Sequence, residues 1–187
     1  MPETRHIPNP MPYASSGDFH RIFDEERDSL YRLSLLLTAD HEKAQQCFVS
    51  GLEDSVKGNP VFKEWARSWA RRAIIQNAVR VINPRPREGD APSIFESFGK
   101  TLAAEQGQTA AILELRPFER FVYVMSILER YSYQDCLLLL GCARQDVIAA
   151  RISALHQISD PDGYRIGVYH WGKSEQEAGE RRIGAKA

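Results

Sequence analysis

Apolar residues recur at three- and four-residue steps in two blocks of the chain, the spacing that places side chains along one face of an α-helix. The first block begins near Asp18 and continues through a leucine-rich stretch to Ile82, and the second runs from Thr109 to about Ser159. Neither block shows the alternation of apolar and polar residues that is typical of strands. The pattern therefore predicts an all-α protein.

The first block is predicted to hold three helices, because two short segments interrupt its periodicity. Residues 38–40 (Thr-Ala-Asp) predict a helix end and the cap of the next helix, since Asp40 can accept its first backbone amides. Residues 57–60 (Lys-Gly-Asn-Pro) then break the chain. The third helix is predicted over residues 61–82. Four of its residues share one stripe, expected to pack in the core: Phe62, Trp65, Trp69 and Ala73.

The second block is predicted to hold four helices, at 109–115, 118–129, 132–140 and 144–158. Arg116-Pro117, Arg130-Tyr131 and Gly141 mark the breaks between them. The last two helices flank the tight turn Gly141-Cys142-Ala143, and these are the dimensions of a helix-turn-helix. Ser132 and Asp135 form a candidate capping box for the first of the pair.

Two small helical domains follow from this pattern, the second of which contains the helix-turn-helix. Pro84 and Pro86 forbid a continuing helix, and the polar run behind them is typical of a linker. The predicted organisation is a proline-rich mobile arm at 1–16, a helical domain at 17–83, a linker at 84–107, a second domain at 108–160 and a tail at 161–187.

The net charge is −1, but positive charge is concentrated in residues 61–87. This segment holds seven basic residues against one acidic residue, Glu64. Cations replace phosphate counterions and flat aromatic rings stack on unpaired bases, so this composition suits a nucleic-acid contact. The candidate DNA contacts on this helix are Arg67, Arg71, Arg72 and Arg80. The alternative is that these arginines form a solvated face that pairs with the acidic residues of 1–60.

The second helix of the predicted helix-turn-helix offers few hydrogen-bond donors for reading bases. Its candidate DNA contacts are Arg144, Gln145 and Arg151. Three further apolar residues widen its apolar surface beyond the stripe that one neighbouring helix needs: Ile148, Ile152 and Leu155. We expect these three residues to contact a protein partner.

Several classes of protein find no support in the sequence. Neither an apolar stretch of roughly 18 residues nor a secretory signal is present, so we expect a cytoplasmic protein without a membrane partner. The three cysteines lack a CxxC spacing and are expected to be free buried thiols. No nucleophile, nucleotide-binding or metal-ligand motif appears, and we expect no enzyme activity, cofactor or metal.

Two stretches resemble the small extracytoplasmic-function sigma factors of RNA polymerase. Residues 19–83 are similar to region 2 of that family, with "LYRLSLLLTADHEKAQQCF" and the tryptophan-containing basic helix "FKEWARSWARRA". Residues 109–158 are similar to region 4, with "LELRPFERFVYVMSILERYSYQDCLLLLGC". The resemblance implies binding to core RNA polymerase and to promoter DNA. It implies polymerase contacts at Asp40, Glu42 and Gln46.

The sequence departs from the family pattern at positions that matter for function. Lys43 and Cys47 stand where acidic residues are common in region 2. Ile148, Ala150 and Ser153 stand where a lysine and two arginines are common in region 4. The alternative hypothesis is therefore a degenerate sigma-like protein, with weak or no DNA binding by region 4. Such a protein would act as an interaction or regulatory module whose partner is an anti-sigma factor or another sigma-like chain.

Overall fold

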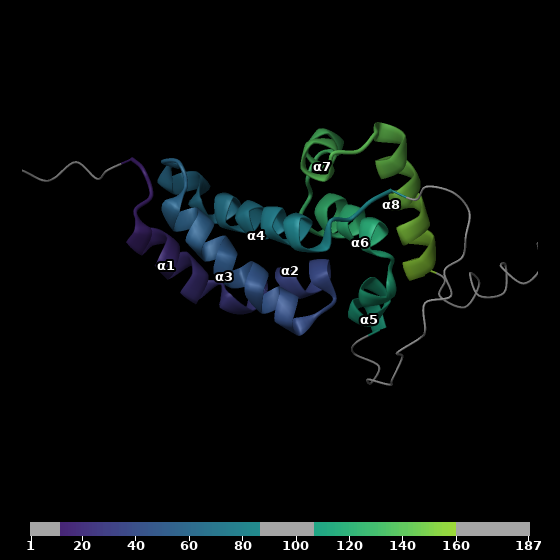
Figure 1. The fold of residues 1–187 in the computed structure, drawn as a ribbon, viewed down its shortest axis with the longest axis horizontal. Helices are drawn as coiled ribbons and strands as arrows, with labels where there is room; N and C mark the ends of the chain where they lie inside the picture. Colours follow the sequence, from purple (N-terminus) through teal and green to yellow (C-terminus); the bar gives the residue numbers. More distant parts are fainter. Residues whose placement is uncertain (1–11, 87–106, 160–187) are drawn as a thin grey trace, which may run out of the picture. The chain divides into compact units, whose positions relative to one another are not determined.

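The computed structural model describes residues 12–86 and 107–159, and every regular element in these ranges is helical apart from one isolated β-bridge (Figure 1). The prediction of an all-α fold is confirmed. The chain divides into two compact units, Met1–Pro84 and Arg85–Ala187. The predicted tail, and the predicted linker except for its first three residues and Gly107, lie outside the described residues.

Unit 1 is built from four α-helices: α1 (Ser16–Glu25), α2 (Arg27–Thr38), α3 (His41–Lys57) and α4 (Ala66–Ile82). A 3-10 turn, η1 (Lys63–Trp65), leads directly into α4. Helices α2, α3 and α4 pack against one another, and α1 packs on all three. The buried side chains of the core include Phe19, Phe23, Leu30, Leu37, Ile74 and Ile75.

The helix boundaries in unit 1 follow from local capping. Ala39 ends α2 in the left-handed conformation (φ 53°), and the Asp40 carboxylate accepts a 3.0 Å bond from the amide of Lys43. The predicted boundary at residues 38–40 is therefore confirmed. At the start of α1, Ser15 and Asp18 form a reciprocal capping box that fixes the entry of the chain.

The predicted core stripe of the third helix is wrong at its first two residues, since Phe62 and Trp65 are exposed. The α-helix begins only at Ala66, and its buried side is made of alanines and isoleucines rather than aromatic rings. Small side chains let α3 and α4 approach closely. A Cβ atom added at Gly51 on α3 would lie 2.8 Å from Cγ1 of Ile74 on α4. The other two residues of the predicted stripe are not exposed, since Trp69 is half-buried and Ala73 is buried.

Part of the predicted mobile arm belongs to unit 1. Tyr13 forms an antiparallel bridge with Phe62, in which the Ala14 amide donates to the Val61 carbonyl (2.7 Å) and the Lys63 amide to the Pro12 carbonyl (3.0 Å). The assignment of the arm to 1–16 is therefore too long at its C-terminal end. Residues 1–11 lie outside the described residues.

Unit 2 contains α5 (Gly107–Glu114), α6 (Pro117–Tyr123), α7 (Tyr133–Leu140) and α8 (Arg144–Ser159). A single π-helical turn, η3 (Val124–Leu128), extends α6. Helices α5, α6 and α7 all pack on α8. The fully buried side chains here include Phe121, Val122, Met125, Cys136 and Val147.

The breaks predicted in the second block are also found in unit 2. Pro117 opens α6, Arg130 adopts a left-handed conformation, and Gly141 (φ 61°) ends α7 where a side chain would be strained. Ser132 caps α7 by accepting a 3.1 Å bond from the amide of Asp135. The buried Arg120 donates to the carbonyls of Leu113 and Leu115 and so fixes the corner between α5 and α6.

Candidate functional site

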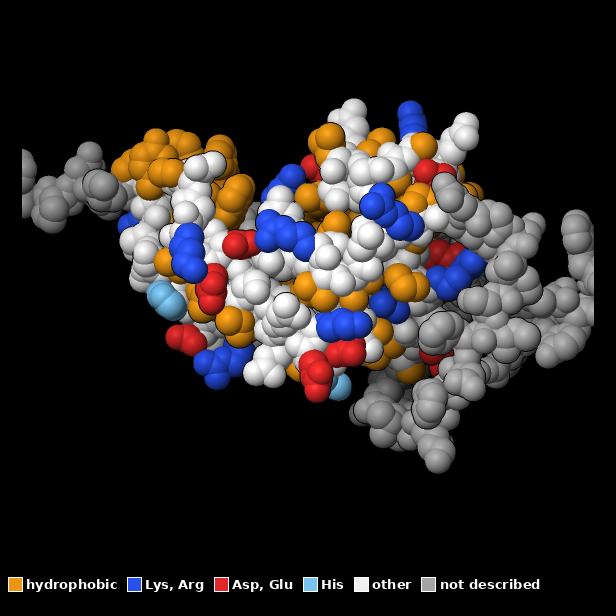
Figure 2. Space-filling model, viewed as in Figure 1, with side chains coloured by type: hydrophobic (Ala, Val, Ile, Leu, Met, Phe, Trp, Pro, Cys, Tyr) orange, Lys and Arg blue, Asp and Glu red, His pale blue; other side chains and the backbone are white. Residues whose placement is uncertain are grey.

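An exposed aromatic cluster lies at the head of α4. The rings of Tyr13 and Phe62 stack with centroids 4.8 Å apart, and Trp65 meets Phe62 edge-on at 5.3 Å. Tyr13, Phe62 and Trp65 are 42, 38 and 58 % exposed. In Figure 2 hydrophobic side chains gather at this end of unit 1, over the segment that precedes α4. We call these three residues the aromatic cluster.

The backbone holds the aromatic cluster in place, because the β-bridge joins Tyr13 to Phe62 and Trp65 closes the 3-10 turn onto Phe62. Lys63, in the same turn, lies 3.8 Å from the carboxylate of Asp18 at the start of α1. Rigid exposed rings beside a cation suit stacking on planar ligands such as unpaired bases. Sequence analysis missed Tyr13, since a proline-rich segment carries no periodic signal.

Two of the predicted DNA-contacting arginines already have acidic partners on α1 and the start of α2. Arg67 donates to Glu25 at 2.7 Å and also pairs with Glu26. Arg71 donates to the hydroxyl of Ser29 at 3.1 Å and lies 3.6 Å from Glu26. The hydrogen bonds that Arg67 donates to Glu26, and then to Glu25, raise the pKa of Arg67. The alternative noted above, pairing with the acidic N-terminal block, therefore describes Arg67 and Arg71 in this structure.

The four predicted arginines of α4 do not form one face. Arg67 and Arg71 lie one turn apart, whereas Arg80 pairs with Asp54 of α3 at 3.0 Å, on another side of the helix. Arg72 is half-buried. Asn77 also donates to Asp54 (2.9 Å), and its hydrogen bond, followed by that of Arg80, lowers the pKa of Asp54.

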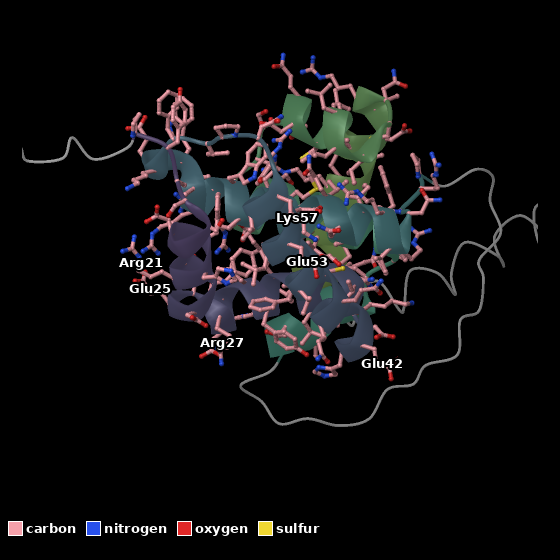
Figure 3. The ribbon with its side chains drawn as sticks, turned by 60° about the vertical axis from the view of Figure 1, so that its left-hand side comes forward. Arg21, Glu25, Arg27, Glu42, Glu53 and Lys57 are labelled. Atoms are coloured by element: carbon pink, nitrogen blue, oxygen red, sulfur yellow. The ribbon has the colours of Figure 1, made fainter. Side chains whose placement is uncertain are left out.

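The predicted polymerase contacts lie at the N-terminal part of α3. Asp40 caps the helix. The hydrogen bond that its carboxylate accepts from the amide of Lys43 lowers the pKa of Asp40. Glu42 and Gln46 are exposed one turn apart, and the exposed Val49 follows on the next turn. Figure 3 labels Glu42 near the start of α3 and the pair Glu53 and Lys57, joined at 3.1 Å, near its end. These residues form a surface of mixed charge with an apolar centre.

The predicted base-reading donors of α8 are divided between two environments. Arg144 and Gln145 are exposed on the first turn. Arg151 instead donates to the hydroxyl of Tyr133 on α7 at 2.9 Å, and its guanidinium lies 5.4 Å from the centre of that ring. Arg151 therefore ties α8 to α7 in this structure.

Ala150 and Ser153, two positions where the resemblance to sigma factors leads one to expect arginine, face the interior of unit 2. Ala150 is buried. The hydroxyl of Ser153 donates to the buried carboxylate of Glu119 on α6 at 2.8 Å, and Gln157 donates to the same carboxylate at 3.2 Å. Arg116 pairs with Glu119 as well. These positions on α8 serve packing and hydrogen bonding within unit 2.

The three residues predicted to contact a partner, Ile148, Ile152 and Leu155, are 37, 55 and 38 % exposed on α8. They follow one another at four- and three-residue steps, so they form one stripe, which we call the α8 stripe. Leu138 on α7 is exposed as well. The opposite side of α8, with Val147, Ala150 and Ala154, is buried.

Comparison with protein-family models and with curated protein sequences found no match. Residues 12–86 and 107–159 contain no group of three His, Cys, Asp or Glu side chains placed to hold a metal ion. In the same part of the chain, no helix has the length and apolarity needed to cross a membrane. Burial raises the pKa of Cys47 and of Cys136 to about 11, so neither thiol is a ready nucleophile at neutral pH.

Proposed function

We propose that this chain is a sigma-factor-like transcription initiation protein whose unit 1 contacts core RNA polymerase and unpaired promoter DNA. No reaction is catalysed by the chain in this proposal. Its role is to bind and to position DNA through contacts that are made by surface side chains. The observation that carries the proposal is the aromatic cluster at the head of the basic helix α4.

The aromatic cluster suits unpaired bases better than it suits duplex DNA. Bases in a duplex are stacked on one another, whereas a separated strand exposes a flat π-face that an exposed aromatic ring can cover. Trp65 is the most exposed ring of the cluster, and Phe62 holds it from one side. Stacking on such a ring contributes roughly 1–3 kcal/mol per base.

A second candidate function is a degenerate sigma-like protein in which unit 2 is an interaction module. The environment of α8 favours this candidate for unit 2. Arg151 is held by Tyr133, and the outward side of α8 presents the α8 stripe rather than a row of cations. Recognition helices depend on several donors that point into the groove, and of the three predicted donors of α8 only Arg144 and Gln145 are exposed.

Fluorescence anisotropy with labelled single- and double-stranded oligonucleotides tests the proposal for unit 1. We expect the full chain to bind the single strand more tightly than the duplex. Trp65→Ala should weaken single-strand binding by roughly 1–3 kcal/mol per lost stacking contact. The matched control is Leu138→Ala, which removes an exposed apolar side chain from unit 2. Equal affinity of the Trp65→Ala variant and the parent chain would overturn the assignment of the aromatic cluster.

A further inference from the structure

The α8 stripe is an apolar surface that unit 2 does not need for its own packing. Val147, Ala150 and Ala154 already bury the opposite side of α8 against the rest of the unit. Ile148 and Leu155 are seven residues apart, so the stripe is about 10 Å long at 1.5 Å per helical residue. Single exposed apolar residues are common on protein surfaces and need no explanation. Three large aliphatic side chains in one row form a contiguous apolar patch, and such patches usually mark a binding surface.

The surroundings of the α8 stripe argue against a polyanion as its occupant. The exposed neighbours on the same side of α8 are Arg144, Gln145, Ala149 and His156, and Arg144 lies only at the N-terminal end of the stripe. The nearby cation Arg151 is engaged with Tyr133. An apolar row bordered by mostly uncharged side chains suits contact with another apolar segment. It has few cations with which to bind the phosphates of a polyanion.

We infer that the apolar segment at residues 164–171 of the chain's own C-terminal tail covers the α8 stripe. Helix α8 ends at Ser159, and the sequence continues for 28 residues to Ala187. Within them, apolar side chains gather in "YRIGVYHW" at 164–171, and polar and small residues dominate the remainder. The segment at 164–171 therefore has the chemistry that the stripe requires.

The length of the connection fits a return of the chain along α8. Residues 160–163 (Asp-Pro-Asp-Gly) separate the helix end from the apolar segment, and these residue types favour a turn. If this segment is extended, the side chains of Tyr164, Ile166 and Val168 lie on one side of it. Neighbouring side chains in this row are about 6.6 Å apart, so the row is roughly 13 Å long. This length matches the stripe of about 10 Å. The end of the stripe at Leu155 lies only four residues before the helix end, within reach of that turn.

The covalent connection also favours this segment over a second copy of the chain. A segment joined by a short linker has an effective concentration in the millimolar range at its target. A second copy at micromolar concentration would need a much higher affinity to compete for the same surface. Docking of the tail in cis therefore needs no dimer.

Site-directed disulfide formation tests this inference in the full chain, in a Cys142→Ser background that leaves the buried Cys47 and Cys136 in place. One variant carries Ile152→Cys with Ile166→Cys, and the matched control carries Ile152→Cys with Ala185→Cys in the same tail. Circular dichroism first confirms that both variants keep their helical content. Both are then oxidised with oxidised glutathione at low protein concentration.

We expect the Ile152–Ile166 pair to form an intramolecular disulfide roughly tenfold faster than the control pair, because docking raises the local concentration of the thiol. Equal rates for the two pairs would overturn the inference. Disulfide-linked dimers that form faster than the intramolecular bond would also overturn it and would assign the stripe to a second copy. Neither outcome depends on DNA or polymerase, so the proposed function is tested separately.

Discussion

At the scale of single residues, Gly51 is a position where the packing of two helices tolerates little change. A Cβ atom there would lie 2.8 Å from Cγ1 and 3.3 Å from the backbone nitrogen of Ile74. We predict that Gly51→Ala lowers the free energy of unfolding by about 1–3 kcal/mol through overpacking of α3 against α4. Gly17→Ala is the matched control, because its new Cβ would meet nothing closer than 3.7 Å.

Urea denaturation followed by circular dichroism measures both glycine variants. Alanine favours a helix over glycine by about 0.5–1 kcal/mol, so the Gly17→Ala control should be neutral or slightly stabilising. A Gly51→Ala variant that is as stable as this control would contradict the close approach of α3 and α4.

Asp54 links α3 to α4 and makes the stability of unit 1 depend on pH. Its pKa in the folded chain lies below its ordinary value because Asn77 and Arg80 donate to its carboxylate. The stabilisation is therefore present above the unfolded pKa and is lost as the pH falls through the lower folded pKa. We predict that Asp54→Ala costs about 0.5–1 kcal/mol at pH 7, a small value because the pair is largely exposed.

Urea midpoints of the Asp54→Ala variant and the parent chain, measured from pH 7 down to pH 2, check this prediction. The difference between the two should shrink below about pH 4. A difference that stays constant over the whole range would show that Asp54 acts through packing alone.

At the scale of helices, the sequence was sufficient wherever a residue determines its own local conformation. The side chains of Asp40 and Ser132 cap helices, and Gly141 ends a helix because it has no side chain. The predicted boundaries at these three residues are confirmed. The buried face of α4 depends instead on how closely α3 approaches it. That distance is set by Gly51, far away in the sequence, and aromatic spacing wrongly placed Phe62 and Trp65 in the core.

The candidate site was predicted less well than the helices, for a related reason. Arg67 and Arg71 were identified as cations, but their pairing with Glu25 and Glu26 joins residues about forty positions apart. Periodicity in one helix holds no information on such a partner. Tyr13 was missed for the same reason, because it joins the aromatic cluster only through its bridge to Phe62.

The pairing between α1 and α4 leads to a prediction at this scale. Glu25 and Glu26 compete with phosphate for Arg67, and Glu26 competes for Arg71. We predict that the double variant Glu25→Gln, Glu26→Gln binds single-stranded DNA more tightly than the parent chain. The slope of log K against log salt should become steeper by about one, since freed arginines displace counterions.

Salt-dependent fluorescence anisotropy measures this effect on α4. Glu53→Gln is the control, because Glu53 pairs with Lys57 on α3 and not with an arginine of α4 (Figure 3). Unchanged affinity and slope in the double variant would mean that Arg67 and Arg71 do not reach DNA even when their acidic partners are neutral.

At the scale of the whole molecule, the two compact units meet at Pro84 and Arg85 in the sequence. Pro84 and Pro86 prevent α4 from continuing into the second unit. We predict that limited trypsin digestion cuts first between Arg85 and Lys100 and leaves a resistant fragment on each side. Mass spectrometry of the early products locates the cut. A first cut inside α3 or α8 would contradict the division into two stable helical units.

Binding to core RNA polymerase tests the central proposal most directly. Affinity capture of purified core polymerase by the full chain should succeed, and Glu42→Lys with Gln46→Lys should reduce it, because both residues are exposed one turn apart on α3. Glu114→Lys, a charge reversal at an exposed residue of α5 in unit 2, is the matched control and should bind nearly as well as the parent chain. Failure of the parent chain to capture core polymerase at micromolar concentration would contradict the proposal that it is a sigma-like initiation protein.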